Sequence, residues 1–285
     1  MVLQENSGKY NLKLRIMSLA KKIGSPKVAL NSCTIGVMEL SFVDDKWAAN
    51  FLTDKEMDVC QSYQCRARKE RWKVGRILSK YLVLNLLVEG KNSDHNLLGV
   101  NKERLSEYSI WMYRIVEIVP SGNSNGYAKI LWCGKTLKFN FSISYSGRKV
   151  YSVISNRRNI GLDVERIGQR RSVFETGNFT LRERKWVEEL SNERAIPTQW
   201  LFTLLWSIKE AFIKSYNSKD LSVWNFPMID VELSSKNEII DKMYTSKYLE
   251  KFTCLNIALN FNGFINMVHL KASTDKKKVL AIANN

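Results

Sequence analysis

Three acidic residues, Asp163, Glu165 and Glu210, are the part of this sequence best suited to chemistry. The first two lie in the run 160–165, where apolar and acidic residues alternate. This period of two predicts a buried strand with both carboxylates on the same face. Converging carboxylates repel one another unless a cation lies among them, and a set of oxygen ligands suits Mg²⁺. The sequence therefore predicts a magnesium site at the edge of an apolar strand.

The third acid lies in a segment with helical spacing. Trp206, Glu210 and Lys214 recur at i, i+4 and i+8, which places them in one line along a helix. A lysine one turn beyond the acid brings positive charge close to the metal, a combination that suits polyphosphate chemistry. Trp206 fits a position beside this site and a packing role in the core equally well.

Three segments together resemble the 4′-phosphopantetheinyl transferases. They read Gly-Leu-Asp-Val-Glu at positions 161–165, Phe-Thr-Leu-Arg-Glu at 179–183 and Trp-Ser-Ile-Lys-Glu-Ala-Phe-Ile-Lys at 206–214. Their order and spacing are similar to the two-halved type of the family, which activates surfactin synthetase. The clear resemblance covers about 75 residues, from Ser142 to Lys214.

The resemblance implies a reaction in which the phosphopantetheine arm of coenzyme A moves to a serine of an apo carrier protein, with release of 3′,5′-ADP. The expected partner is an acidic acyl or peptidyl carrier protein. Asp163 and Glu210 would hold Mg²⁺, with Glu165 as a third ligand directly or through water. Either Glu210 or Glu165 would take the serine proton, and Lys214 would stabilise or protonate the leaving group.

Contacts to coenzyme A are expected from Arg71, Ser144, Tyr145 and Glu183, together with Lys214. Family members usually carry Ser-His-Ser, whose histidine touches the 3′-phosphate, where this chain has tyrosine at position 145. A phenol donates one hydrogen bond but carries no charge at neutral pH. Arg71 matches a family arginine near the nucleotide. Glu183 matches a family acid near the pantetheine phosphate, and it also fits the second position of a helix capping box.

The charge balance leaves two alternatives open. A formal charge of +16 and a pI near 9.6 imply an anionic partner, which could be nucleic acid, a membrane surface, a phosphorylated cofactor or an acidic protein. A nucleic-acid binder would explain the charge, but no zinc-finger, RNP or homeodomain signature is present, and we expect no nucleic-acid partner. A catalytically impaired family member is the second alternative, favoured by Tyr145.

Cysteine usage and hydropathy indicate the cellular setting. The 5 cysteines are odd in number and lack zinc-ligand spacing with the 2 histidines, so reduced thiols are the simplest interpretation. No stretch reaches the ~20 consecutive apolar residues of a membrane span. We expect a cytoplasmic monomer.

Internal sequence similarity predicts two related halves. Three pairs of segments are similar, with offsets of 125, 127 and 134, namely 35–39 with 160–164, 53–56 with 180–183, and 72–74 with 206–208. Each Thr-x-x-Glu in these segments fits a capping box at the start of a helix. In this alignment Met38 corresponds to Asp163 and Arg76 to Glu210, so only the second half can hold the metal.

The predicted fold is α+β, with two similar lobes facing one another and the site in the cleft between them. A basic extension covers residues 1–33, the N-terminal lobe 34–157, and the C-terminal lobe, with the metal site, 158–285. Runs 108–119 and 127–131 are apolar and β-branched on either side of a Pro-Ser-Gly-Asn turn, which predicts a hairpin.

Overall fold

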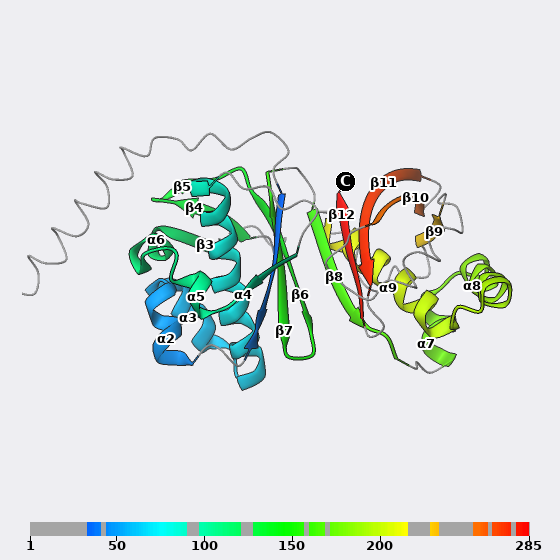
Figure 1. The fold of residues 1–285 in the computed structure, drawn as a ribbon, viewed down its shortest axis with the longest axis horizontal. Helices are drawn as coiled ribbons and strands as arrows, with labels where there is room; N and C mark the ends of the chain where they lie inside the picture. The colour runs from blue at the N-terminus through cyan, green and yellow to red at the C-terminus, as the bar shows by residue number, and fades with distance from the viewer. Residues whose placement is uncertain are drawn as a thin grey trace, which may run out of the picture.

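The computed structural model describes residues 33–40, 44–89, 97–120, 128–156, 160–168, 172–215, 229–233, 253–261, 264–274 and 278–284. Its helices and strands form an N-terminal and a C-terminal lobe, and strands from both lobes lie side by side at the centre of the molecule (Figure 1). The predicted basic extension lies outside the described residues, except for Cys33, which begins the first strand.

The N-terminal lobe is built on a four-stranded sheet in the order β2-β1-β7-β6. Strand β1 pairs in parallel with β2 and antiparallel with β7, and β7 pairs antiparallel with β6. The strands are β1 (Cys33–Glu39), β2 (Leu97–Val100), β6 (Asn140–Ser146) and β7 (Lys149–Ser155). The long helix α4 (Arg66–Leu84) packs on β1 and β7 through apolar residues that recur at helical spacing, Ile77, Leu78, Tyr81 and Leu82.

Shorter elements complete this lobe. They are the helices α2 (Asp45–Phe51), α3 (Asp54–Ser62), α5 (Lys102–Leu105) and α6 (Ile110–Ile115), the π-helical turn η2 (Asn85–Glu89), and the small sheet of β3 (Val116–Pro120), β4 (Ala128–Trp132) and β5 (Lys135–Thr136). The predicted hairpin is confirmed where β3 pairs with β4. The predicted first strand, 108–119, was wrong in its first part, because residues 110–115 are helical. Tyr113 is fully buried there, its hydroxyl donates to the Leu105 carbonyl, and this packing overrides the strand propensity.

The C-terminal lobe contains a five-stranded sheet in the order β8-β12-β11-β10-β9. Its strands are β8 (Ile160–Arg166), β9 (Ile229–Leu233), β10 (Thr253–Phe261), β11 (Phe264–Thr274) and β12 (Lys278–Asn284), and its helices are α7 (Ser172–Asn178), α8 (Leu181–Arg194) and α9 (Thr198–Ser215). Helix α9 packs on β8 and β12, with Leu204, Ile208 and Phe212 fully buried. Mixed sheets and helices of this kind make an α+β fold.

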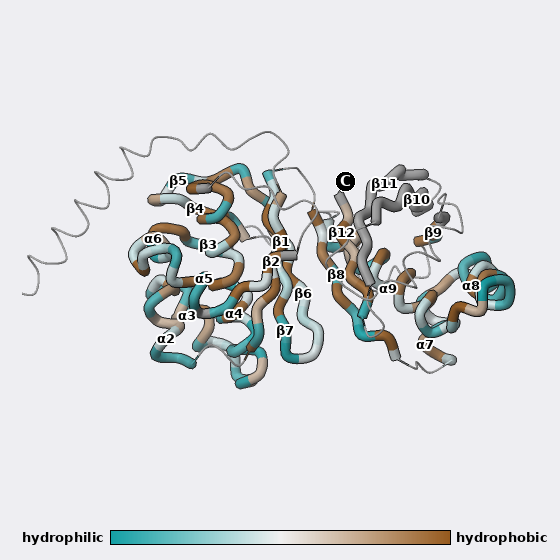
Figure 2. Tube along the Cα trace, viewed as in Figure 1, coloured by the Kyte–Doolittle hydropathy of each residue, from teal (hydrophilic) through white to brown (hydrophobic). Residues whose placement is uncertain are grey.

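A separate core cluster joins the two sheets. Tyr151 and Val153 of β7 pack with Leu162 of β8 and with Leu280 and Ile282 of β12. Figure 2 shows hydrophobic stretches on the strands at the centre of the molecule, β8 among them. The lobes therefore share apolar contact along their meeting strands.

Each lobe contains a buried lysine that pairs with the glutamate of a capping box. In the N-terminal lobe, Thr53 caps α3 and Glu56 completes the box, as the sequence predicted. Lys80 of α4 forms an ion pair with Glu56 and donates to the Phe51 carbonyl at 3.0 Å. The second carboxylate oxygen of Glu56 accepts from the amide of Ile118 in β3, also at 3.0 Å. The pair thus connects two helices to a strand.

The C-terminal lobe repeats this arrangement with its own residues. Thr180 caps α8, Glu183 completes the box, and Lys209 of α9 donates to Glu183 at 2.7 Å and to the Asn178 carbonyl at 3.0 Å. Glu183 accepts from the amide of Val231 in β9 at 2.9 Å. These two lysines are 129 positions apart, whereas the sequence comparison matched Trp72 with Trp206 at an offset of 134.

When the two lysines are matched, Tyr81 rather than Arg76 is the counterpart of Glu210. The surroundings of two glycines fit the same offset. A Cβ on Gly36 would meet Leu82, and a Cβ on Gly161 would meet Ala211, two residues beyond the respective lysines. Within the described ranges, no helix combines the length and apolar character needed to cross a membrane.

Candidate active site

The closeness of β8 and α9 brings the predicted catalytic side chains together. Asp163 comes from β8, and Glu210 and Lys214 lie one turn apart near the end of α9. A Cβ added to Gly161 would lie only 1.9 Å from the carbonyl oxygen of Ala211. Only glycine allows the helix backbone this close to the strand. The glycine of the 160–165 motif therefore serves to place α9 beside Asp163.

Two carboxylates and one ammonium group form the centre of the site. Lys214 Nζ donates to Asp163 Oδ1 at 2.8 Å and lies 3.4 Å from Glu210 Oε2. Asp163 is buried, and its Oδ2 atom has no hydrogen-bond partner within the part of the chain that the structure describes. A buried carboxylate oxygen without a partner is costly, so this atom is suited to a ligand.

Burial and neighbouring charges set the protonation of this group. Burial raises the pKa of Glu210 above its usual range, and Asp163 adds to the rise while Lys214 opposes it. Burial alone would lower the pKa of Lys214, but the Asp163 and Glu210 carboxylates outweigh burial and raise it. Lys214 therefore keeps its charge at neutral pH, while Glu210 accepts a proton more readily than an exposed glutamate.

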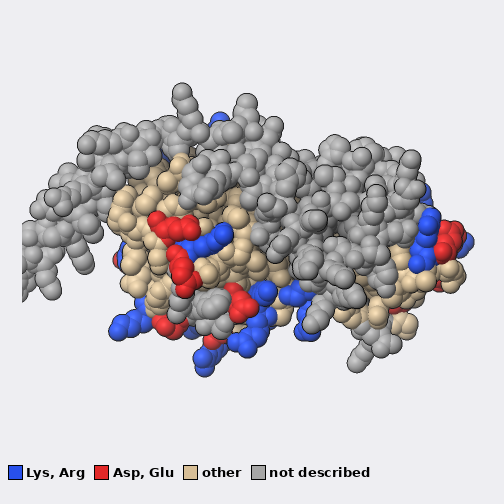
Figure 3. All heavy atoms as spheres, in the orientation of Figure 1, with Lys and Arg blue, Asp and Glu red and all other residues tan. Residues whose placement is uncertain are grey.

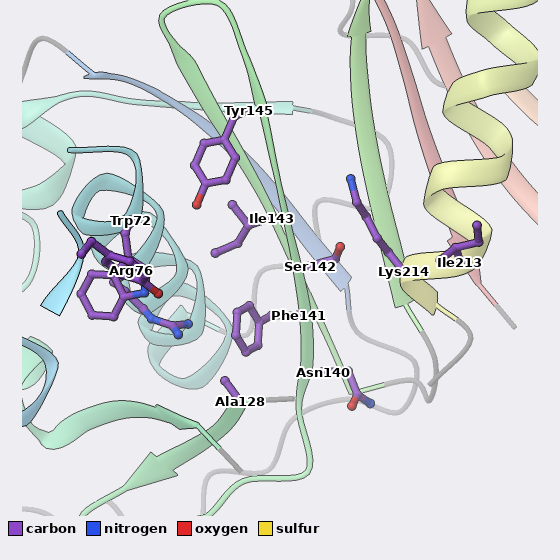
Figure 4. A pocket seen from close by; sticks show the side chains of 11 residues that line it. Trp72, Arg76, Ala128, Asn140, Phe141, Ser142, Ile143, Tyr145, Ile213 and Lys214 are labelled. Carbon is purple, nitrogen blue, oxygen red and sulfur yellow. The ribbon is translucent and has the colours of Figure 1, made fainter. Parts of the chain in front are cut away.

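A pocket of about 490 Å³ opens beside Lys214 and extends toward the N-terminal lobe (Figure 4). Its lining comes from both lobes and comprises Tyr63, Trp72, Arg76, Ala128, Asn140, Phe141, Ser142, Ile143, Tyr145, Ile213 and Lys214. In Figure 4 Lys214 lies on one side and Trp72 and Arg76 of α4 on the other, with the side chains of β6 between them. The pocket is therefore a space between the lobes with a cation on each side.

Arg76 lines the pocket, although the sequence analysis did not name it among the expected cofactor contacts. Its guanidinium lies 5.0 Å from the ring centroid of Trp72 and 5.5 Å from that of Phe141. Its Nε atom is buried and has no hydrogen-bond partner within the described part of the chain. The sequence pattern that could have pointed to Arg76 is Arg-x-x-x-Gly-Arg at 71–76, in which only Arg71 was expected to contact the cofactor. The arginine that lines the pocket is the second one.

Tyr145 also lines the pocket, where its hydroxyl packs close to Gly75 of α4. Burial raises the pKa of Tyr145, although the charges of Arg76, Arg71 and Lys214 oppose the rise. The phenol therefore stays protonated at neutral pH and keeps its one hydrogen to donate.

The other predicted residues lie in different surroundings. Arg71 is exposed on α4 and is not part of the pocket lining, although its charge reaches Tyr145. Ser144 is buried, and its hydroxyl is bonded to β8. Glu183 is 1% exposed and is engaged in the capping box and the ion pair with Lys209, away from the pocket lining. Its carboxylate thus takes the structural role that the sequence offered as the alternative.

The predicted set of three metal-binding carboxylates is not assembled in this structure. Glu165 is half-buried on β8, two residues from Asp163, but no three Asp, Glu, His or Cys side chains gather as a metal site among the described residues. The assembled group is instead Asp163 and Glu210 around Lys214. Trp206 is half-buried and packs on Phe174, with ring centroids 4.7 Å apart, so its packing role is the one observed.

Comparison with protein families identifies the C-terminal half. Residues 159–260 match the family model described as the 4′-phosphopantetheinyl transferase superfamily. The matched segment begins just before β8 and includes α9, so Asp163, Glu210 and Lys214 all lie within it. A comparison with curated proteins finds no match. This chain therefore carries a 4′-phosphopantetheinyl transferase superfamily domain at residues 159–260, which confirms the resemblance found in the sequence and points to a transferase.

Proposed function

We propose that this protein transfers the 4′-phosphopantetheine moiety of coenzyme A to a serine of an acidic apo carrier protein, acyl or peptidyl, in a Mg²⁺-dependent reaction that releases 3′,5′-ADP. The observation that carries the proposal is the group of Asp163, Glu210 and Lys214 beside a pocket that Arg76 and Tyr145 also line. A cofactor with a pyrophosphate and a separate 3′-phosphate needs positive charge at two places. Lys214 and Arg76 supply these charges from different lobes.

The residues of the site fit a divalent cation. Asp163 presents a buried Oδ2 atom that has no partner among the described residues, and Glu210 reaches the same ammonium group as Asp163. Carboxylate oxygens are the ligands that Mg²⁺ takes in proteins. Asp163 and Glu210 would hold the ion, with Glu165 as a third ligand directly or through water. When bound, Mg²⁺ would offset the negative charge of the pyrophosphate.

In the proposed reaction, the serine oxygen forms a bond to the β-phosphorus of coenzyme A, and the bond from this phosphorus to the bridging oxygen breaks. Lys214 keeps its charge and would stabilise or protonate the departing 3′,5′-ADP. Glu210, whose pKa burial raises, is suited to take the serine proton, and Glu165 is the other candidate. Arg76 and Tyr145 would donate hydrogen bonds to the nucleotide part of the cofactor.

Surface charge supports an acidic protein partner. Arg66, Arg68 and Arg71 are exposed at the start of α4, the helix that also supplies Trp72 and Arg76 to the pocket. Figure 3 shows Lys and Arg side chains gathered along the lower edge of the view near the middle of the molecule. We propose a cytoplasmic monomer, and the cytoplasmic setting is supported by Cys60, Cys65 and Cys133, which form no disulfide among the described residues. The repeated capping boxes and buried ion pairs support the further proposal that the two lobes are an internal duplication.

The direct test is incubation of the purified chain with coenzyme A, Mg²⁺ and a panel of apo carrier domains, followed by mass spectrometry. We expect at least one carrier to gain the mass of phosphopantetheine, and no gain with Asp163→Asn. A panel spanning fatty-acid, polyketide and peptide synthesis with no modified carrier would count against the proposal.

Calorimetry separates this function from nucleic-acid binding, which the net charge of +16 would also favour. Duplex binding needs no Mg²⁺ and falls with salt, with a log–log slope of about −0.9 per phosphate neutralised. Coenzyme A should require Mg²⁺ and lose much less affinity over the same salt range, because part of its contact is coordination. Tight duplex binding without Mg²⁺, and no heat from coenzyme A, would favour the alternative.

A further inference from the structure

Two strands from different sheets meet where the lobes join. Strand β6 is the last strand of the four-stranded sheet and β8 is the first of the five-stranded sheet, and the two are in close contact (Figure 1). Two buried serines of β6 bond to backbone amides of β8. Ser142 Oγ accepts from the Leu162 amide at 3.0 Å, and Ser144 Oγ accepts from the Val164 amide at 3.1 Å. We call this pair of contacts the serine seam.

The two serines of the seam differ in one respect. Ser144 Oγ also lies 3.2 Å from Asp163 Oδ1. A hydroxyl has one proton, and an ionised carboxylate can only accept, so Ser144 donates to Asp163 while it accepts from the Val164 amide. Ser142 Oγ, by contrast, accepts from the Leu162 amide on the opposite strand.

The two oxygens of Asp163 are therefore treated differently. Oδ1 accepts from Ser144 of the N-terminal lobe and from Lys214 of α9. Oδ2 is buried and has no partner among the described residues. Two donors on the same oxygen restrict rotation of the carboxylate and leave the other oxygen for a ligand. Partners of metal ligands commonly orient them in this way.

We propose that Ser144 is a positioning residue, which holds Asp163 Oδ1 so that Oδ2 is presented to the divalent cation. This inference rests on the proposed function. It gives Ser144 a different role from the cofactor contact predicted from the sequence. Ser144 as a residue is only 4% exposed, and its hydroxyl lies between two strands. Metal binding in the C-terminal lobe then depends on the serine seam with the N-terminal lobe.

The test is direct binding of Mn²⁺, measured by electron paramagnetic resonance in the presence of coenzyme A. We expect Ser144→Ala to weaken Mn²⁺ binding about tenfold, the low end of the usual effect of removing a partner of a metal ligand. Ser79→Ala is the matched control, since it removes a buried serine hydroxyl of the N-terminal lobe, bonded to Ser152 at 2.8 Å, without touching Asp163 or the pocket lining. Its affinity for Mn²⁺ should stay within about twofold of wild type on the same reasoning.

Stability is measured on the same samples. Both alanine variants should lower the midpoint of thermal unfolding by a few degrees, ~2–4 °C for one lost hydrogen bond in a chain of this size. If Ser144→Ala does not fold, Ser144→Cys nearly preserves the volume and leaves a weaker donor, so it should show a smaller loss of Mn²⁺ affinity.

The possible failures are distinguishable. If wild type binds Mn²⁺ and the Ser144 variants bind it as tightly as Ser79→Ala does, the positioning role is wrong and the proposed function is untouched. If wild type itself binds no Mn²⁺ with coenzyme A present, the proposed function fails and this inference fails with it.

Discussion

In each lobe a buried lysine of a long helix bonds to the glutamate of a capping box and to a backbone carbonyl, and the glutamate in turn accepts from a strand. Lys80 with Glu56 and Lys209 with Glu183 make these contacts. Beside this shared framework the lobes differ. When the two lysines are matched, and likewise Gly36 with Gly161, the counterparts of Asp163 and Glu210 are Met38 and Tyr81, each 1% exposed.

This difference distinguishes the residues that stabilise each lobe from the acidic residues of the candidate site. The lysine–glutamate pairs are fully enclosed in both lobes and link helix, helix and strand. The acids occur in one lobe only, at the edge where the strands meet. The N-terminal lobe contributes to the site through other elements, since Trp72 and Arg76 come from α4 and Tyr145 from β6. Matched substitutions in the two lobes test this contrast.

The largest expected difference is between Asp163→Asn and Met38→Leu. Asn keeps the shape of the aspartate but removes its charge, so transfer should fall at least about a thousandfold, equivalent to ~4 kcal/mol of barrier. Met38→Leu conserves volume in the core and should leave transfer unchanged, at a cost in stability below about 1.5 kcal/mol. Initial rates of carrier modification measure both. Full activity of Asp163→Asn would show that the acid present in the C-terminal lobe is not needed for catalysis.

The second comparison is between Lys209→Met and Lys80→Met. Each change leaves a buried glutamate without its cation, and we expect a loss of about 3 kcal/mol or more in the free energy of unfolding. The losses should be similar, because the contacts are alike in the two lobes. Adding Glu183→Gln to Lys209→Met should restore part of the loss. Denaturant unfolding of the four proteins checks this, and a cost confined to one lobe would contradict the shared framework.

The same ion pair predicts a dependence on pH. Burial raises the pKa of Glu183 in the folded state, and Lys209 opposes that rise. A carboxyl group whose pKa is raised on folding contributes stability at pH below its ordinary value, and this contribution is lost as the pH rises through the raised value. In Lys209→Met the opposing charge is gone, so stability should fall more steeply than in wild type as the pH rises above the ordinary pKa of a glutamate. The midpoint of unfolding, measured against pH for both proteins, checks this. The same slope in wild type and in Lys209→Met would argue against the charged pair.

Glycines at matching positions provide the next contrast. A Cβ on Gly161 would lie 1.9 Å from the Ala211 carbonyl oxygen and 2.6 Å from the Ser215 amide, both backbone atoms. Gly161→Ala must therefore shift α9, and we expect a loss of about 3 kcal/mol in stability together with reduced transfer. The atoms nearest to a Cβ on Gly36 would be side-chain methyl groups of Leu82 and Leu78, at 3.0 and 3.1 Å. Gly36→Ala should cost about 1 kcal/mol, and thermal unfolding distinguishes the two variants.

Local patterns predicted the parts of the structure that depend on neighbours in the sequence. Both capping boxes were found where Thr-x-x-Glu occurs, and α9 has the line of Trp206, Glu210 and Lys214 that its spacing indicated. The strand at 160–165 also formed as its alternation predicted. In each of these cases the determining interactions lie within one helix or strand.

Contacts between distant segments could not be predicted in this way. No periodicity shows that Lys80 and Lys209 are buried, because lysine is usually exposed and only its partner makes burial possible. The role of Ser144 depends on a hydrogen bond that crosses from one sheet to the other. Arg76 reached the pocket because α4 turns that side of the helix toward β6, which the Arg-x-x-x-Gly-Arg pattern alone did not indicate.

The last comparison concerns the share of the N-terminal lobe in cofactor binding. If the Tyr145 hydroxyl donates to the 3′-phosphate of coenzyme A, Tyr145→Phe should weaken binding by ~1.5 kcal/mol, the lower range for a hydrogen bond to a charged group. Tyr145→His should bind coenzyme A equally well or better, because a histidine can add positive charge there. Dephospho-coenzyme A lacks the phosphate in question, so wild type and Tyr145→Phe should bind it with the same affinity. Calorimetry with both cofactors decides the matter, and a clear difference with the dephospho form would place the Tyr145 hydroxyl on another part of the cofactor.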